Sequence, residues 1–345
     1  MKILVTGAAG FIGAQLSREL AKRGDHVIGI DSINDYYDVR FKYDRLAESG
    51  FLFPDCDSPW GEQFTSTKYP TLRFIRIDIS NRESVNALFE AERFDKVVNL
   101  AAQAGVRHSA TNLYAYIESN IMGFANILEA CRCNNIMNLI YASSSSVYGL
   151  NSKVPFSEDD AVDTPVSLYA ASKKSNELMA HCYSKLYGIK TIGLRFFTVY
   201  GPWGRPDMAP MLFASSISRG ESINVFNNGD LSRDFTYIDD IVDGTIATID
   251  YEFAELDSAN TIPYKIFNIG CSSPVKLMDF ISEIELALGV EANKVLLPMQ
   301  PGDTYHTYAD TSKLEKEIGY KPMVSLHDGI QRFIEWYRSD KNSLK

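Results

Sequence analysis

Short apolar segments alternate with amphipathic segments over residues 1–200. The apolar segments have the length of strands, and strands are predicted over 2–5, 26–30, 71–78, 96–100, 138–142 and 190–196. Helices are predicted between them, over 11–23, 84–92, 120–133 and 169–187. Regular alternation of this kind indicates βαβ units, whose parallel strands form a sheet covered by helices on both faces. The expected fold class is α/β, with a Rossmann-type doubly wound parallel sheet.

The alternation is interrupted twice. Residues 48–70 are rich in Gly, Pro, Ser and aromatic residues, which predicts a long surface insertion of the kind that often forms a lid or contacts a partner. Beyond residue 200, turn-forming stretches such as GPWGRPD and NNGD become frequent. We therefore expect a first domain over 1–200, which includes the insertion, and a smaller α/β substrate-binding region over 201–345, interleaved with the first.

Charge and composition exclude several classes of partner. The formal net charge is −10 and Lys and Arg form no run, which argues against a nucleic acid or an anionic membrane as partner. No apolar stretch approaches the roughly 18 residues of a membrane span. The opening MKILVTG has no signal-peptide pattern, and the five cysteines are scattered. These features predict a cytoplasmic protein without a disulfide framework or a metal site.

A glycine motif lies between the first predicted strand and the first predicted helix. Gly7, Gly10 and Gly13 would let the backbone approach a pyrophosphate, whose charge then meets the helix N-terminus. Asp31 ends the second strand, where a carboxylate can accept hydrogen bonds from ribose hydroxyls and repels a 2′-phosphate. Asp31 could instead cap a turn. Together the glycines and Asp31 predict binding of NAD rather than NADP, with Asp78 and Ile79 near the adenine.

A second polar cluster predicts catalysis. Tyr169 and Lys173 are four residues apart and share one face of a predicted helix. The serines at 143–146 follow a predicted parallel strand at its carboxyl end, where open α/β sheets bind ligands. A nearby ammonium favours a phenolate, so Tyr169 can act as a general base although the pKa of free tyrosine is about 10. Y-x-x-x-K alone is common, but beside the serine cluster it indicates an active site.

The motifs resemble those of a known group of enzymes. GAAGFIG, SSSSVYG, YAASK and RDFTYIDD resemble the extended short-chain dehydrogenase/reductase superfamily. NDYYD, LAAQAGVRHS, FFTVYGPWGRPDM and MQPGD resemble the UDP-glucuronate 4-epimerases, and only the insertion 48–70 falls outside the resemblance. It implies NAD-dependent interconversion of UDP-glucuronate and UDP-galacturonate through a 4-keto sugar, a role in polysaccharide biosynthesis, and a homodimer formed through helices 120–133 and 169–187.

The resemblance also implies roles for individual residues. Ser144, Tyr169 and Lys173 take the catalytic positions, and Tyr169 and Lys173 also contact the cofactor. Further cofactor contacts are implied at Phe11, Ile12 and Ala101. Substrate contacts are implied at Arg107, Ser144, Ser145, Thr198, Arg205, Arg233 and Asp303.

For three of these residues the resemblance implies which group of UDP-glucuronate they contact. Arg233 would meet the pyrophosphate and Asp303 the uridine ribose. Arg205 would grip the uronate carboxylate bidentately, in an orientation that prevents loss of CO₂ from the 4-keto acid. A loop salt bridge or a phosphate contact is the alternative role for Arg205.

Two serines separate this chain from related enzymes. Ser145 and Ser146 stand where related 4,6-dehydratases carry Asp-Glu and where related decarboxylases carry Glu before Val-Tyr-Gly. Neither reaction therefore has its acid–base group here. The remaining alternatives are a 4-epimerase of a neutral substrate, UDP-glucose or UDP-N-acetylglucosamine, and a non-catalytic NAD-sensing protein. The intact Tyr169/Lys173 pair favours an enzyme over a sensor.

Overall fold

The computed structural model describes residues 1–254, 262–299 and 305–344. The chain divides into two compact units, each assembled from three segments. Unit 1 consists of Met1–Asn151, Ala161–Arg195 and Thr245–Phe267. Unit 2 consists of Ser152–Asp160, Phe196–Gly244 and Asn268–Lys345.

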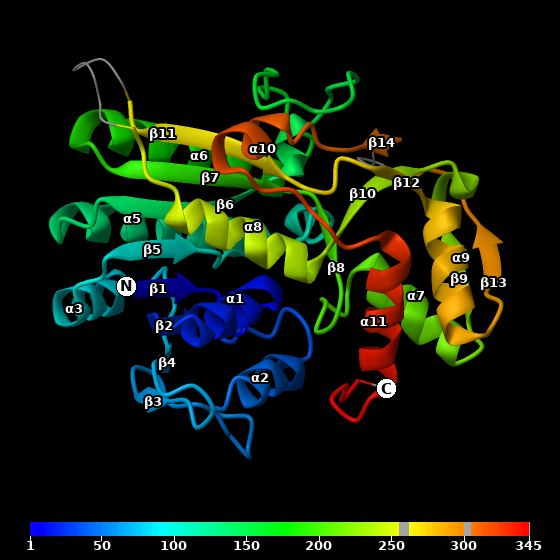
Figure 1. Ribbon diagram of the computed structural model, residues 1–345, viewed down its shortest axis with the longest axis horizontal. Helices are drawn as coiled ribbons and strands as arrows, with labels where there is room; N and C mark the ends of the chain where they lie inside the picture. The colour runs from blue at the N-terminus through cyan, green and yellow to red at the C-terminus, as the bar shows by residue number, and fades with distance from the viewer. Residues whose placement is uncertain (255–261, 300–304, 345) are drawn as a thin grey trace. The chain divides into compact units, whose positions relative to one another are not determined.

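Unit 1 is built on a large sheet. Within the described residues it has eight strands in the spatial order β11-β7-β6-β5-β1-β2-β4-β3 (Figure 1). The strands are β1 (Lys2–Thr6), β2 (His26–Asp31), β3 (Gln63–Thr65), β4 (Leu72–Arg76), β5 (Lys96–Asn99), β6 (Asn138–Ser144), β7 (Lys190–Phe196) and β11 (Tyr264–Ile269). Central neighbours from β4 to β6 pair in parallel. The predicted Rossmann-type α/β fold is confirmed.

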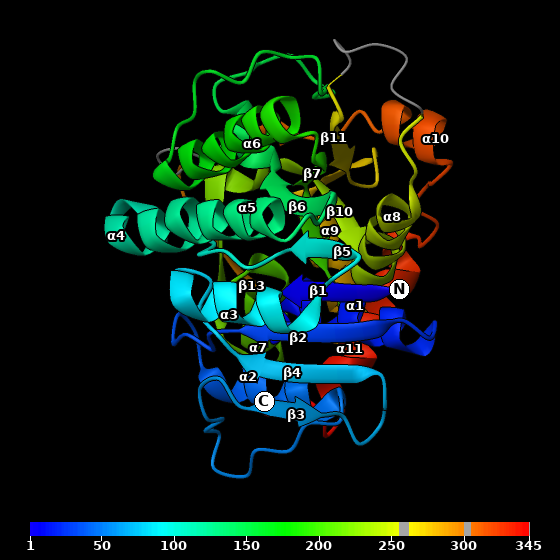
Figure 2. The same cartoon turned by 90° about the vertical axis from the view of Figure 1, so that its left-hand side faces the viewer.

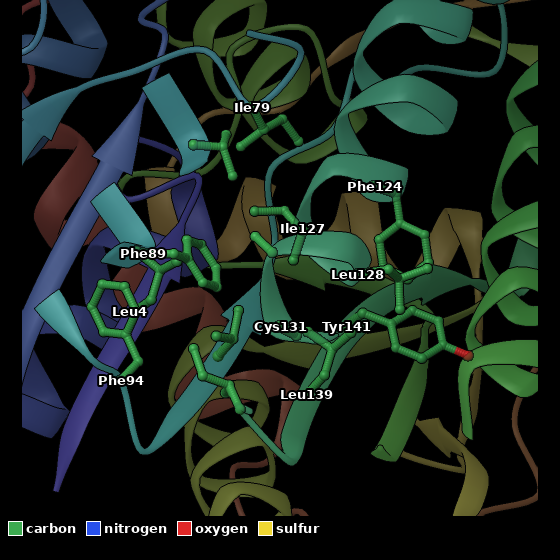
Figure 3. Close-up of a cluster of buried hydrophobic side chains, with 14 of the residues drawn as sticks. Leu4, Ile79, Phe89, Phe94, Phe124, Ile127, Leu128, Cys131, Leu139 and Tyr141 are labelled. Carbon is green, nitrogen blue, oxygen red and sulfur yellow. The ribbon is translucent and has the colours of Figure 1, made fainter. Parts of the chain in front are cut away.

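Helices cover both faces of this sheet, as Figure 2 shows. On one face lie α3 (Arg82–Glu92), α5 (Phe124–Cys133) and α6 (Leu168–Tyr187), and on the other lie α1 (Phe11–Lys22) and the unit 1 end of α8 (Ile238–Asp250). Because both faces are covered, β1 is almost continuously apolar and buried from Ile3 to Val5. Between the sheet and α3 and α5 lies an apolar cluster that includes Leu4, Phe89, Ile127 and Leu139 (Figure 3).

The segment 48–70 is more ordered than a surface loop. It follows α2 (Val39–Glu48) and contains β3, which pairs antiparallel with β4 at the edge of the sheet. Phe53 packs edge to face against Phe64, with ring centroids 4.9 Å apart, and Phe51 is buried against Phe74 of β4. Several aromatic residues of the predicted surface insertion thus form a small core with β4, while most of the segment's other side chains are exposed. Its role stays a prediction.

Unit 2 combines short strands with helices. Its strands are β8 (Thr198–Tyr200), β9 (Ser222–Val225), β10 (Ser232–Tyr237), β12 (Pro274–Lys276), β13 (Asn293–Leu296) and β14 (His306–Thr307). Its other helices are α7 (Ala209–Ser218), α9 (Leu277–Leu288), α10 (Ser312–Ile318) and α11 (Leu326–Arg338). β10 pairs with β8, β12 and β14. Phe235 of β10 stacks on Phe280 of α9 at 3.9 Å between ring centroids, which fixes the helix on the sheet.

Candidate active site

The glycine motif forms a tight loop from β1 into α1. Gly7 has a φ of +74°, and a side chain there would start 3.0 Å from the amide nitrogen of Ala101. The Gly10 amide donates to the Gly7 carbonyl oxygen at 2.9 Å. A Cβ at Gly13 would overlap that same carbonyl oxygen. Each glycine is therefore required by the close packing of the loop against β5 and the first turn of α1.

This loop has the features of a dinucleotide site. Gly10 precedes α1 and has no side chain to cap it, so the amide groups of the first turn, which Phe11 and Ile12 open, can bind an anion. The Asp31 carboxylate accepts from the Ala9 amide at 3.1 Å and from the Ile33 amide at 2.8 Å. Asp31 thus closes its own turn and also lies against the glycine loop. The loop and Asp31 fit the pyrophosphate and a ribose of NAD.

One residue that supports the loop was not predicted from the sequence. Arg45 of α2 is fully buried, and its Nη1 donates to the Ala9 carbonyl oxygen at 3.1 Å and to the Tyr37 hydroxyl at 2.6 Å. The guanidinium therefore holds the glycine loop from behind and places a positive charge near the expected pyrophosphate. The signal was available: Arg45 follows the buried Phe41 by four residues and so occupies the buried face of α2.

The catalytic candidates meet where β6 ends and α6 begins. β6 ends at Ser144, and the Ser167 side chain caps α6 by accepting from the Ala170 amide at 3.1 Å. Lys173 is buried, its Nζ donates to the Ala142 carbonyl oxygen at 2.9 Å, and it lies 6.0 Å from the centroid of the Tyr169 ring. Burial lowers the pKa of Lys173 to about 8. The three predicted groups thus share one site in unit 1.

The serine cluster has a defined local structure. The Ser144 hydroxyl oxygen is buried and accepts from the Ser146 amide at 3.1 Å, which starts the turn η3 (Ser145–Tyr148). Ser145 is half-buried. Tyr169 is also half-buried, and Tyr116 of α4 (Leu113–Tyr116) packs edge to face on its ring with centroids 6.2 Å apart. Ser144 and Tyr169 therefore both lie near the carboxyl end of β6, where this fold binds ligands.

Asn120 is a second residue that was not predicted. It lies in the π-helix η2 (Ile117–Gly123), and its Oδ1 accepts from the Gln103 amide at 2.8 Å. Its Nδ2 donates to the Gln103 carbonyl oxygen at 3.1 Å and to the Ser172 hydroxyl at 2.9 Å. Asn120 thus ties the loop after β5 to the helix that carries Tyr169 and Lys173. Its spacing from other residues gave no signal of this role.

Four further residues of unit 1 were predicted to contact the cofactor or the substrate, namely Asp78, Ile79, Ala101 and Arg107. The Asp78 carboxylate accepts from the amide and the hydroxyl of Ser80, at 2.8 and 2.7 Å, and the Ile79 side chain is buried in the apolar cluster. Arg107 is exposed and precedes the short helix η1 (His108–Ala110). Ala101 lies against Gly7 and so borders the glycine loop. The ligand contacts of Asp78, Ile79 and Arg107 stay predictions.

Two of the predicted substrate contacts, Thr198 and Arg233, lie on neighbouring strands of one sheet in unit 2. Thr198 of β8 pairs with Phe235 of β10, and Arg233 precedes Phe235 by two residues on the same strand. Arg233 donates to the carbonyl oxygens of Ser232 and Tyr305, at 2.9 and 3.2 Å. The buried Asp234 carboxylate then accepts amides from two loops, at Cys271, Ser272 and Ala309. β10 is therefore anchored on either side of Arg233.

Arg205 and Asp303 are the last two predicted substrate residues. Arg205 donates to Asp207 from both Nε (3.0 Å) and Nη2 (2.6 Å), so the loop salt bridge that the sequence left open is present. The contact of Arg205 with a substrate carboxylate stays a prediction. Asp303 lies outside the described residues.

Neither a membrane helix nor a metal cluster is found in the part of the chain that the structure describes. No described helix is long and apolar enough to cross a membrane. Among residues 1–254, 262–299 and 305–344, no three His, Cys, Asp or Glu side chains are grouped to hold a metal ion.

The glycine loop and the Ser144–Tyr169–Lys173 site are typical of the extended short-chain dehydrogenase/reductases, and comparison with known proteins agrees with that class. The chain belongs to the NAD dependent epimerase/dehydratase family, whose model matches residues 3–270. Protein CapI of Staphylococcus aureus is 50% identical over 346 residues, which cover 98% of both chains. UDP-glucuronate 4-epimerase 4 of Arabidopsis thaliana is 45% identical over 348 residues, covering 98% of this chain and 75% of that protein.

A solved structure supports the same assignment. UDP-glucuronic acid 4-epimerase from Bacillus cereus, in complex with UDP-glucuronic acid and NAD, matches with a TM-score of 0.83 and 36% identity. The match covers 97% of this chain and 98% of that one. The resemblance to UDP-glucuronate 4-epimerases that the sequence indicated is confirmed.

Proposed function

We infer that this protein is an NAD-dependent UDP-sugar 4-epimerase that interconverts UDP-glucuronate and UDP-galacturonate. The observation that carries the inference is the site at the end of β6. There Lys173 lies beside Tyr169, and Ser144 is followed by two further serines rather than by carboxylates. The site therefore has a base for proton transfer, and it lacks at Ser145 and Ser146 the acidic groups that dehydration or decarboxylation would use. The Arabidopsis thaliana relative is a UDP-glucuronate 4-epimerase, and the Bacillus cereus structure contains UDP-glucuronic acid and NAD.

The proposed mechanism assigns one task to each residue of the site. The glycine loop and Asp31 would hold NAD, which would supply the acceptor for the C4″ hydride of the sugar and the source of that hydride for the opposite face of the keto sugar. Tyr169 takes the proton of the 4″-hydroxyl and gives it back at the end. The Lys173 ammonium stabilises the phenolate form of Tyr169, and the Ser144 hydroxyl holds the sugar oxygen in line. Because the hydride removed from C4″ would return to the same carbon and Tyr169 gives its proton back, the reaction involves no net oxidation, and we expect the cofactor to stay bound.

A uronate adds a requirement that a neutral sugar does not. A 4-keto uronate is a β-keto acid, and it loses CO₂ when the breaking C–C bond lies parallel to the carbonyl π orbitals. We propose that Arg205 prevents this alignment by holding the carboxylate with two hydrogen bonds. Asp207 occupies the Nε and Nη2 side of the guanidinium in the structure, so it would orient Arg205 or exchange with the substrate carboxylate.

The proposed function is tested by incubating the purified protein with UDP-glucuronate, without added NAD⁺, and recording ¹H NMR spectra. We expect UDP-galacturonate to accumulate to a constant ratio, with no pentose and no released NADH. Formation of UDP-xylose or of a 4-keto pentose would identify a decarboxylase and refute the interpretation of Ser145 and Ser146. Conversion of UDP-glucose or UDP-N-acetylglucosamine in place of UDP-glucuronate would identify a neutral-sugar epimerase.

Arg205→Ala tests the choice of substrate. We expect kcat/KM for UDP-glucuronate to fall about 100-fold, which corresponds to the loss of one charge-assisted carboxylate contact of roughly 3 kcal/mol. The rate with any neutral UDP-sugar that the wild type accepts should change much less. The control is Asp207→Asn, which leaves the guanidinium in place but removes the negative charge of its internal partner. An equal loss for both classes of sugar would rule out a carboxylate role for Arg205.

We also propose that the protein is a cytoplasmic homodimer and that its product serves polysaccharide biosynthesis. Five cysteines are free thiols, which suits a reducing compartment. Large apolar side chains are exposed on neighbouring helices of unit 1, at Tyr114 and Met122 on α4 and η2 and at Leu178 and Leu186 on α6. A second copy packed on these helices would cover them. Sedimentation velocity should show a dimer that Leu178→Glu converts to a monomer; a monomeric wild type would exclude this interface.

A further inference from the structure

We propose that the buried ion pair of Glu177 and Arg195 is a positioning device that sets the place of Ser144 relative to Tyr169 and Lys173. Both side chains are almost fully buried, at 1% and 3% exposure. Arg195 Nε donates to Glu177 Oε1 at 2.9 Å, and Nη2 donates to Oε2 at 3.0 Å. The pair is therefore bidentate and fixes the guanidinium plane on the carboxylate.

The pair holds the catalytic serine segment at both of its ends. The Ser143 hydroxyl, one residue before Ser144, donates to Glu177 Oε1 at 2.7 Å. Arg195 Nη1 donates to the Tyr148 hydroxyl, four residues after Ser144, at 3.0 Å. Ser144 thus lies between two points that one ion pair restrains. Ser143 and Tyr148 are themselves buried, so the network is closed to solvent.

The same pair belongs to the helix of the other catalytic groups. Tyr169, Lys173 and Glu177 follow one another at intervals of four along α6 and so share one face of the helix. A carboxylate on that face grips the end of β6 and η3, while Arg195 brings in β7. The Glu177–Arg195 contact thereby fixes the distance between the Ser144 hydroxyl and the Tyr169 phenol, which lie on different segments of the chain.

The charges of the pair are balanced within the protein. Burial acts to lower the pKa of Arg195, but the hydrogen bonds to Glu177 and Tyr148 together with the charge of Glu177 raise it, so the guanidinium remains charged. The Lys174 ammonium adds a second cation 3.6 Å from Glu177 Oε2. Substitutions that keep the ion pair and cut only one of its links to the serine segment should therefore leave the fold intact, because no buried charge is left alone.

The test rests on the proposed function and measures turnover of UDP-glucuronate in three variants. Ser143→Ala and Tyr148→Phe each remove one hydrogen bond between the ion pair and the serine segment. Arg195→Lys keeps the positive charge but loses the bidentate contact. We expect kcat for UDP-glucuronate to fall roughly 10-fold in the first two variants and up to about 100-fold in the third, since a shift of 1 Å costs about that much. KM and bound NAD should stay at wild-type values. Ser143→Thr should recover most of the loss, because it restores the hydroxyl.

A matched control distinguishes positioning from general weakening of the fold. Ser184 of α6 and Thr191 of β7 share a buried hydrogen bond of 2.8 Å between the same two elements, away from the serine segment. The double variant Ser184→Ala, Thr191→Val removes that bond, and kcat should remain within about twofold of wild type. Equal losses in this control and in the link variants would overturn the inference, as would a loss that appears in KM instead of kcat. A wild type without epimerase activity would instead refute the proposed function, and the inference with it.

Discussion

Tyr169→Phe should lower kcat for UDP-glucuronate by about 10³-fold, because it removes the atom that accepts the 4″-hydroxyl proton and nothing else. The phenyl ring keeps its edge-to-face contact with Tyr116, at 6.2 Å between ring centroids, so the local packing should survive. Initial rates from ¹H NMR give kcat, and the absorbance of NAD released on denaturation gives the bound cofactor. We expect wild-type NAD content and near wild-type affinity for UDP-glucuronate.

Tyr183→Phe is the control for this experiment. Tyr183 lies on the same helix, and its hydroxyl donates to Glu129 at 3.0 Å rather than facing the serine cluster. Removing that hydroxyl should leave kcat within about twofold of wild type, since exposed or half-buried hydrogen bonds are worth only about 1 kcal/mol of stability. A Tyr169→Phe protein with unchanged turnover would mean that another group is the base.

Lys173→Met should be the second large loss, about 100-fold in kcat at pH 7. The wild-type pKa of Lys173 is lowered to about 8 by burial, so the ammonium is present below pH 8 and disappears as the pH rises through that value. The phenolate of Tyr169 then loses its electrostatic support, and kcat should fall on the alkaline side with a midpoint near 8. The variant should lack this alkaline limb. A wild-type rate that is flat from pH 7 to 10 would contradict the assignment.

The lowered pKa of Lys173 also affects the free energy of unfolding. Lys173 binds its proton less tightly in the folded protein than in the unfolded chain. At pH values below the folded pKa of about 8, the protonated lysine therefore lowers the free energy of unfolding. This cost decreases as the pH rises from about 8 to the pKa of an unfolded lysine, about 10.4. At pH 7 the cost is on the order of 3 kcal/mol. Lys173→Met removes the buried charge, although it also gives up the hydrogen bond to Ala142. Urea unfolding at pH 7 should therefore show a variant at least as stable as the wild type, yet nearly inactive.

Much of the fold and site could be predicted because it depends on local rules. The glycines of the loop are fixed by a positive φ at Gly7 and by the overlap that any side chain at Gly13 would create, and both requirements leave a mark on the sequence. Asp31 ends a strand at the position where the fold places a ribose. Tyr169 and Lys173 are one helical turn apart. Each of these signals lies within a single strand, turn or helix.

What could not be predicted depends on contacts between distant segments. Glu177 and Arg195 are 18 residues apart, and both link to residues more than 30 positions away along the chain. Asn120 binds Gln103 and Ser172 across 17 and 52 residues. Polar residues in helices and strands usually face solvent, so their burial here is decided by tertiary packing alone. The three-residue strand β3 is also too short to show an alternating pattern.

The way the two units share the chain limits how this enzyme can be altered. Three segments of each unit alternate along the sequence, so the backbone passes from one unit to the other five times. A chain cut at residue 200 would lose β11 and expose the backbone edge of β7 that β11 normally pairs, a surface prone to aggregate. Neither half can be exchanged as a cassette between homologues. Changes in sugar preference must therefore come from substitutions made in place, within a continuous full-length chain.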